Sequence, residues 1–114
     1  MKLKIKRVYE KPSKEDCVRI LVDRLWPRGL TKEKAAVDLW LKDIAPSTEL
    51  RKWFSHDPKN WTEFRKKYLQ ELIDNQEQVS ILKERLKNDV VTLVYSAKDE
   101  EDNEALVLKE LFSR

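Results

Sequence analysis

Val90-Val91-Thr92-Leu93-Val94-Tyr95 decides the fold, because this apolar and β-branched run is the clearest strand in the chain. A second run, Val18-Arg19-Ile20-Leu21-Val22, is typical of a strand buried on both faces. Over residues 3–9, apolar and charged side chains alternate, which predicts a further strand before Pro12-Ser13 breaks the pattern. The three runs predict a sheet whose strands come from both ends of the chain.

Helical patterns fill most of the remaining sequence. Ser47 can cap a helix because its hydroxyl can accept a free first-turn amide, and Asp57-Pro58 is a strong helix start. A last helix is expected from about Asn103. The apolar positions at helical spacing are Leu50, Trp53 and Phe54; Trp61, Phe64, Tyr68, Leu69 and Leu72; Val79, Leu82 and Leu86; and Leu108, Leu111 and Phe112. We therefore expect Trp53 and Trp61 to pack in the core.

The order of these elements predicts a layered α/β domain. One segment fits two structures, because residues 32–36 favour a helix while residues 37–41 alternate like a strand. The link from Glu10 to Cys17 is short for a parallel crossover, so a hairpin between the first two strands stays open at this point. The pattern does not predict the order of the strands.

Composition limits the chemistry. The chain has 114 residues, which suits one domain over residues 1–114, and it contains one Gly, one Cys and one His. A single Gly excludes a glycine-rich phosphate loop and a dinucleotide fingerprint, since each needs at least two glycines at fixed spacing. A single Cys excludes an internal disulfide, and one Cys with one His excludes a Cys/His zinc cage within the chain. We expect no metal and no cofactor.

Charge is unevenly distributed along the chain. Residues 1–34 carry a net charge of +6, residues 35–88 of +1 and residues 89–114 of −4, for +3 overall. The basic front half could contact phosphates, or it could be neutralised by the acidic tail within the fold. No apolar run approaches the length of a membrane span, and the start lacks the apolar core of a signal peptide. We therefore expect a cytoplasmic protein.

Polar side chains follow two apolar strands. Asp23, Arg24 and Arg28 come after the second strand, and Ser96, Lys98 and Asp99 come after the last. If these strands are parallel neighbours, both sets share the edge of the sheet where ligands of α/β proteins collect. The set could clamp an anion through arginine, or hold a hard cation between Asp23 and Asp99. Alternatively, Asp23 and its arginines form an internal ion network, and Asp99 caps the final helix.

Four further positions carry candidate chemistry. The helix start at Ser47 exposes free amides, and Arg51 would add a cation one turn later. His56 is the only side chain with an unperturbed pKa near neutrality and could act as a general base, or simply bond a helix end. Trp26, between two arginines, could stack on a planar ligand or cover the end of the sheet.

Several of these segments together resemble a known family. They are Asp23-Arg24-Leu25-Trp26-Pro27-Arg28-Gly29, Ala45-Pro46-Ser47, Leu50-Arg51-Lys52-Trp53-Phe54, His56-Asp57-Pro58 and Thr92-Leu93-Val94-Tyr95-Ser96-Ala97-Lys98-Asp99 with Asn103. On these motifs the chain resembles the YeaO-like branch of a bacterial domain-of-unknown-function family, over nearly its whole length. The resemblance implies a small α/β fold with a mainly parallel sheet of three to four strands flanked by helices, which argues against the hairpin.

The resemblance implies no established activity. Longer relatives carry a segment after the last strand that ends in Cys-His-Arg, where this chain has Asn103-Glu104-Ala105, so thiol chemistry is not carried over. Val22-Asp23-Arg24 does resemble the Val-Asp-Val-Arg of those relatives, which favours the edge at Asp23 as a site.

The leading hypothesis is a protein that binds a small anionic ligand, a nucleotide or a phosphorylated metabolite, with hydrolysis or group transfer as its chemistry if it is an enzyme. Candidate catalytic residues are Asp23, His56 and Asp99. Candidate ligand-binding residues are Arg24, Trp26, Arg28, Ser47, Arg51, Ser96 and Lys98. The alternative is a non-catalytic nucleic-acid or protein interaction module, and the oligomeric state stays open.

Overall fold

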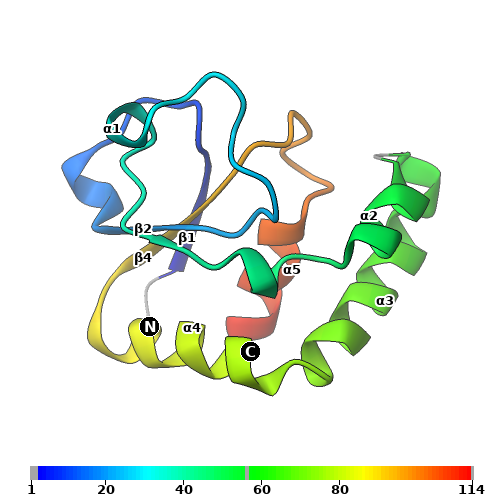
Figure 1. Cartoon of the computed structure of the whole chain (residues 1–114). Coiled ribbons are helices and arrows are strands. Elements are labelled where there is room, and N and C mark those ends of the chain that lie inside the picture. The colour runs from blue at the N-terminus through cyan, green and yellow to red at the C-terminus, as the bar shows by residue number, and fades with distance from the viewer. Residues whose placement is uncertain (1–2, 56, 114) are drawn as a thin grey trace.

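A parallel sheet in the order β1-β4-β2-β3 organises the computed structural model, which describes residues 3–55 and 57–113 (Figure 1). Within those residues its strands are β1 (Leu3–Arg7), β2 (Val18–Leu21), β3 (Leu39–Trp40) and β4 (Val91–Tyr95). The last strand lies between the first two, with Leu93 opposite both Ile5 and Ile20. Every residue of β4 is buried, because it is covered by a strand on each side and by side chains on each face.

The parallel sheet confirms what the family resemblance implied, and a hairpin between the first two strands is wrong. β1 and β2 do not pair; each is hydrogen-bonded in parallel to β4. The link between them returns to the start of the sheet through a short 3-10 turn, η1 (Lys14–Asp16). Two β1 side chains hold this link, because the ammonium groups of Lys4 and Lys6 donate to the carbonyl oxygens of Glu15 and Lys11.

Helices cover the two faces of the sheet unequally. The short helix α1 (Lys32–Ala35) contributes Ala35 to a small apolar cluster on one face. The main core on the other face takes side chains from α2 (Thr48–Phe54), α3 (Trp61–Ile73), α4 (Gln76–Asn88) and α5 (Glu104–Phe112). The side-chain alternation of β4 divides it between these clusters, since Leu93 and Tyr95 belong to the main core and Val94 to the small one.

The predicted helix starts are confirmed by their caps. Ser47 Oγ accepts a hydrogen bond from the Leu50 backbone N–H at 3.1 Å, and Asn103 Oδ1 accepts one from Leu106 at 2.9 Å. Asp57 caps a 3-10 turn, η3 (Pro58–Asn60), that leads directly into α3. The ambiguous segment contains both predicted structures in succession, α1 and then β3, before a second 3-10 turn, η2 (Lys42–Ile44).

A buried ion pair fixes the start of β2. Arg19 on β2 is only 3% exposed, and its guanidinium lies 2.7 Å from the Asp16 carboxylate and donates to the carbonyl oxygens of Ala35 and Ala36. Burial by itself raises the pKa of Asp16, but hydrogen bonds from the Ser13 N–H, Lys6 and Arg19 outweigh this and lower it. Some of the basic residues of the front half therefore hold the fold together.

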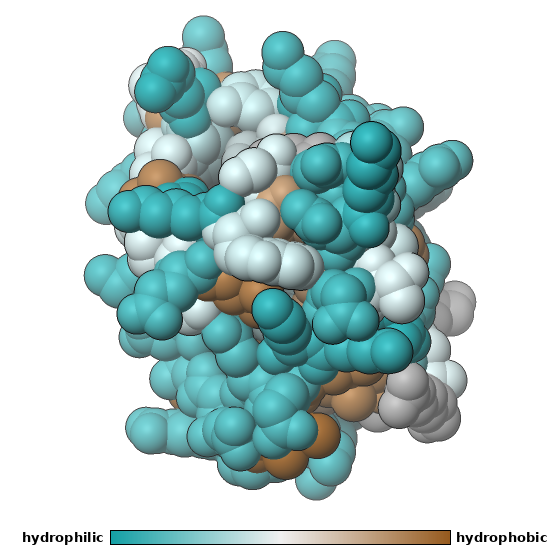
Figure 2. All heavy atoms as spheres, turned by 90° about the vertical axis from the view of Figure 1, so that its right-hand side faces the viewer, coloured by the Kyte–Doolittle hydropathy of each residue, from teal (hydrophilic) through white to brown (hydrophobic). Residues whose placement is uncertain are grey.

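The prediction that Trp53 packs in the core is wrong. Its side chain is 42% exposed on α2, and the Lys67 ammonium lies 3.9 Å from the ring centroid. Its neighbour Phe54 is buried and stacks on Phe64 at 4.3 Å between centroids, while Trp61 is half-buried beside them. Figure 2 shows that the face formed by α2 and α3 is mostly hydrophilic with small apolar patches.

No helix in the described part of the chain is both long and apolar enough to cross a membrane.

Candidate functional site

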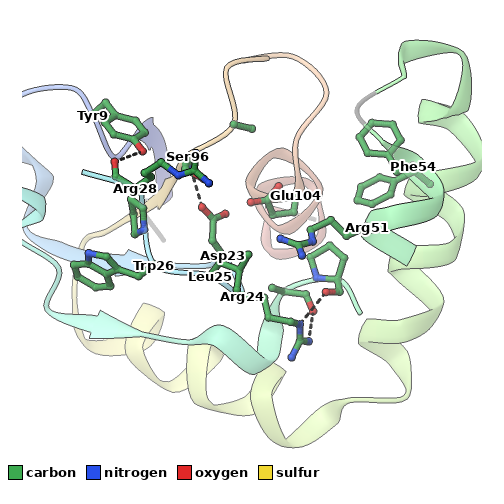
Figure 3. Close-up of a pocket in the computed structure, with 15 residues that line it drawn as sticks. Tyr9, Asp23, Arg24, Leu25, Trp26, Arg28, Arg51, Phe54, Ser96 and Glu104 are labelled. Atoms are coloured by element: carbon green, nitrogen blue, oxygen red, sulfur yellow. Dashed lines mark hydrogen bonds between the residues drawn. The ribbon is translucent and has the colours of Figure 1, made fainter. Parts of the chain in front are cut away.

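A pocket of about 310 Å³ opens at the carboxyl edge of the sheet, beyond β2 and β4 (Figure 3). Parallel strands end at the same edge, so the polar residues that follow them are brought together there. Six of the predicted site residues line the pocket: Asp23, Arg24, Trp26, Arg28, Arg51 and Ser96. The α2–α3 side contributes Phe54 and Phe64, and α5 contributes Glu104.

Asp23 lies at the centre of the pocket and is 9% exposed. Its Oδ2 accepts a 2.8 Å hydrogen bond from the Ser96 backbone N–H, which ties the segment after β2 to the segment after β4. Its own carbonyl oxygen accepts a 2.7 Å bond from the Trp40 indole N–H. The position of this carboxylate is therefore fixed from both its backbone and its side chain.

Glu104 is the second carboxyl group of the pocket, and its side chain is within hydrogen-bonding reach of Asp23. Removal from water raises the pKa of Glu104 well above its ordinary value, and the hydrogen bond and negative charge of Asp23 raise it further. The charge of Arg51 acts in the opposite direction but does not reverse the shift. The Glu104 carboxyl therefore keeps its proton to a higher pH than an ordinary glutamate does.

The arginines of the pocket play different parts. Arg24 donates to the carbonyl oxygens of Ala45 and Pro46 and lies 3.6 Å from the Asp43 carboxylate, so its guanidinium is used to hold the segment before α2. Arg28 is exposed, and Arg51 is partly exposed on the first turns of α2. Among the described residues, neither of these two guanidinium groups is engaged in a hydrogen bond or a salt bridge.

Trp26 covers the end of the sheet. Its indole N–H donates to the Leu30 carbonyl oxygen at 2.8 Å, and its ring meets Trp40 edge-on at 5.5 Å between centroids. In Figure 3 the indole ring extends away from Asp23, although the residue forms part of the pocket wall. Of the two sequence interpretations, this geometry favours covering the sheet.

The other predicted site residues lie elsewhere. Ser47 donates a 2.6 Å bond from its hydroxyl to Glu71, and its backbone N–H bonds the same carboxylate at 2.9 Å, outside the pocket lining. Lys98 is exposed and does not line the pocket. Asp99 does not line it either; its carboxylate accepts from the backbone N–H groups of Glu101 and Asp102, while Asn103 caps α5.

The structure does not support one further hypothesis, the cation site, and does not describe the residue on which another, the general base, depends. A hard cation between Asp23 and Asp99 has no support, since no group of three or more His, Cys, Asp or Glu side chains in the described ranges could hold a metal ion. The general-base hypothesis for His56 concerns a residue outside the described ones.

Sequence reasoning missed Glu104 and Tyr9. Glu104 directly follows the cap Asn103, where an acidic residue is expected in any case because it complements the helix dipole. Tyr9 follows β1 and donates its hydroxyl to the Arg28 carbonyl oxygen at 2.9 Å. The position of Tyr9 after a strand could have marked it as a site residue. No sequence signal marks Glu104, because only the packing of α5 brings it to Asp23.

The fold and the site together define a small parallel α/β protein with a polar pocket at the carboxyl edge of its sheet. A family model described as "Inactive DUF488-N3 subclade" matches residues 2–114, and this chain belongs to that family. It is 46% identical to "Uncharacterized protein YeaO" of Escherichia coli (strain K12) over 108 residues, covering 95% of this chain and 94% of that one. The expected YeaO-like membership is thus confirmed.

Similarity extends to mycobacteria. The chain is 38% identical over 112 residues to "Uncharacterized protein Rv3073c" of Mycobacterium tuberculosis (strain ATCC 25618 / H37Rv), covering 98% of this chain and 94% of the relative. No solved structure matches the chain. These relatives are uncharacterised proteins.

Proposed function

We propose that this chain is a cytoplasmic single-domain protein that binds a small anionic ligand, a nucleotide or a phosphorylated metabolite, and does not turn it over. The observation that carries the proposal is the pair Arg28 and Arg51. They come from different segments and line one pocket, and their guanidinium groups make no hydrogen bond or salt bridge to another described residue. Guanidinium groups bind phosphate and carboxylate through paired N–H donors, so two of them around one cavity suit an anion.

The charge balance of the pocket supports the same conclusion. The raised pKa of Glu104 favours its neutral form and so reduces the negative charge of the pocket, and Arg24 is already balanced in part by Asp43. The cations Arg28 and Arg51 therefore outnumber the negative charge that faces them. An anionic ligand would complete the balance.

Two observations support binding without catalysis. The family model carries the description "Inactive", and this chain matches it over residues 2–114. In the pocket, the Asp23 carboxylate already accepts a hydrogen bond from the Ser96 N–H and lies within hydrogen-bonding reach of Glu104, so part of its capacity to accept a hydrogen bond from a ligand or a water is already used.

Titration calorimetry with inorganic phosphate, ribose 5-phosphate and the nucleoside 5′-monophosphates tests the proposal. We expect at least one compound to bind, and Arg28→Ala and Arg51→Ala each to weaken it about tenfold, as the loss of a hydrogen bond to a charged group does. Arg85→Ala, an exposed arginine on α4, is the matched control and should bind like the parent protein. Absence of binding by every compound, or undiminished binding by both pocket variants, would overturn it.

Catalysis is checked on the same samples. Incubation of the bound compounds with the protein should leave them unchanged by phosphorus NMR and chromatography. Release of phosphate or base that disappears in Asp23→Asn would instead establish a hydrolase.

The alternative, a nucleic-acid or protein interaction module, has weaker support. Several cations of the basic front half are used inside the fold. Lys6 and Arg19 pair with Asp16, and Arg7 donates to the carbonyl oxygens of Ser96 and Ala97. Nucleic-acid binding that falls steeply as salt rises would favour this alternative over the pocket.

A further inference from the structure

We propose that the Asp23–Glu104 carboxyl pair reads the hydrogen-bonding edge of a nucleobase, so that the ligand of this pocket is a nucleotide rather than a sugar phosphate. The inference rests on the proposed function, because it assumes that the pocket holds an anion. The proposed function specifies only the anionic group of the ligand. This inference specifies its uncharged part as a nucleobase.

The pair occupies the middle of the pocket, between Arg28 and Arg51. Figure 3 shows Arg28 on one side of Asp23 and Arg51 beside Glu104 on the other, with both carboxyl groups directed into the same space. Oδ2 of Asp23 is oriented by the Ser96 N–H, and Glu104 is oriented by its place at the start of α5. A ligand whose anionic group reaches either arginine can therefore place a neighbouring part against the carboxyl pair.

The chemistry of the pair selects that part. The two carboxyl groups lie within hydrogen-bonding reach of each other, so their oxygens offer acceptors side by side, and a protonated carboxyl also offers a donor. A nucleobase edge offers the complement, N–H donors beside ring-nitrogen or carbonyl acceptors, in a rigid plane. An ammonium group would also suit the carboxyl pair, but it would lie next to two guanidinium groups and be repelled by them.

The walls favour a flat apolar ring over a sugar. Leu25, Pro27, Pro46 and Phe54 line the cavity around the polar groups. Apolar side chains beside a few placed polar groups are typical of small-molecule sites, and the volume of about 310 Å³ lies at the lower end of their range. Burial of a base against these walls would contribute affinity that a sugar phosphate lacks.

Calorimetry that compares ribose 5-phosphate with AMP, GMP, CMP and UMP tests this inference on the unmodified protein. Ribose 5-phosphate keeps the sugar and the phosphate and lacks only the base. We expect at least one nucleotide to bind about tenfold or more tightly than ribose 5-phosphate, the discrimination that a placed hydrogen bond provides. Equal affinity for ribose 5-phosphate and all four nucleotides would overturn base recognition and leave the anion pocket standing.

The variant Glu104→Ala locates the effect. It should reduce the preference of the protein for the nucleotide over ribose 5-phosphate about tenfold. Glu84→Ala, an exposed glutamate on α4, is the matched control. A preference that survives in Glu104→Ala, with the fold verified by circular dichroism, would overturn the role of the carboxyl pair. Failure of every phosphate compound to bind would overturn the proposed function as well.

Discussion

The backbone N–H of Ser96 donates a 2.8 Å hydrogen bond to Oδ2 of Asp23, and this bond joins the carboxyl ends of β4 and β2. Because Asp23 is nearly buried, the bond is shielded from water and forms the floor of the pocket. The same carboxylate faces Glu104 on α5, so one side chain links two strands and a helix.

Replacement of Asp23 should therefore destabilise the protein. We expect Asp23→Ala to lower the free energy of unfolding by about 1–3 kcal/mol, because the Ser96 N–H loses its acceptor in a buried site. Asp23→Asn should cost less, since its amide oxygen can still accept. Urea denaturation measures both, and Asp74→Ala on the exposed end of α3 should change stability by less than about 0.5 kcal/mol. Equal stability of Asp23→Ala and the parent would contradict the role of this bond.

The raised pKa of Glu104 makes stability depend on pH. A carboxyl whose pKa is higher in the folded protein than in the unfolded chain binds more protons when folded, so its contribution is greatest below the ordinary value of 4.5. That contribution is lost as pH rises through the folded pKa. As pH rises from the ordinary value to the raised folded pKa of Glu104, we expect the urea concentration at the unfolding midpoint to fall in the parent protein and to fall less in Glu104→Gln. Parallel curves for the two proteins would contradict the shift.

Ser47 is predicted to serve the fold and not the ligand. Ser47→Ala removes the cap on the Leu50 N–H and the hydroxyl bond to Glu71, and should lower the free energy of unfolding by about 1–2 kcal/mol. Ser80→Ala, an exposed serine inside α4, is the control and should be nearly neutral. Any ligand found for the pocket should bind Ser47→Ala with unchanged affinity. Lost binding at unchanged stability would restore Ser47 to the site.

The adjacent aromatic residues Trp53 and Phe54 on α2 should differ sharply in how much stability the protein loses when each is replaced by alanine. Trp53 contacts the Lys67 ammonium on the surface, so Trp53→Ala should cost about 0.5–1 kcal/mol. Phe54 is buried against Phe64, so Phe54→Ala should cost about 3–5 kcal/mol. Urea denaturation of the two variants compares them directly, and a larger loss for Trp53→Ala would mean that this residue is packed.

Part of the site was predictable because it follows strands. Asp23 and Ser96 come directly after apolar runs, Arg28 follows Asp23 in the same loop, and parallel strands deliver such residues to one edge. Lys98 and Asp99 follow β4, as Ser96 does, but they lie further along the loop that leads to α5. This loop carries them away from the pocket. The pattern of residue types contains no signal for where a loop bends.

Sequence alone determined the local structure of this protein. The run ending at Tyr95 is a strand because its side chains are apolar and β-branched, and helices start at Ser47 and Asn103 because these side chains accept first-turn amides. Tertiary structure decided which strands and helices lie next to each other. Backbone hydrogen bonds form equally well between any two strands, so nothing local places β4 between β1 and β2. That placement sets α5 against the sheet, brings Glu104 to Asp23, and turns a charged edge into a pocket.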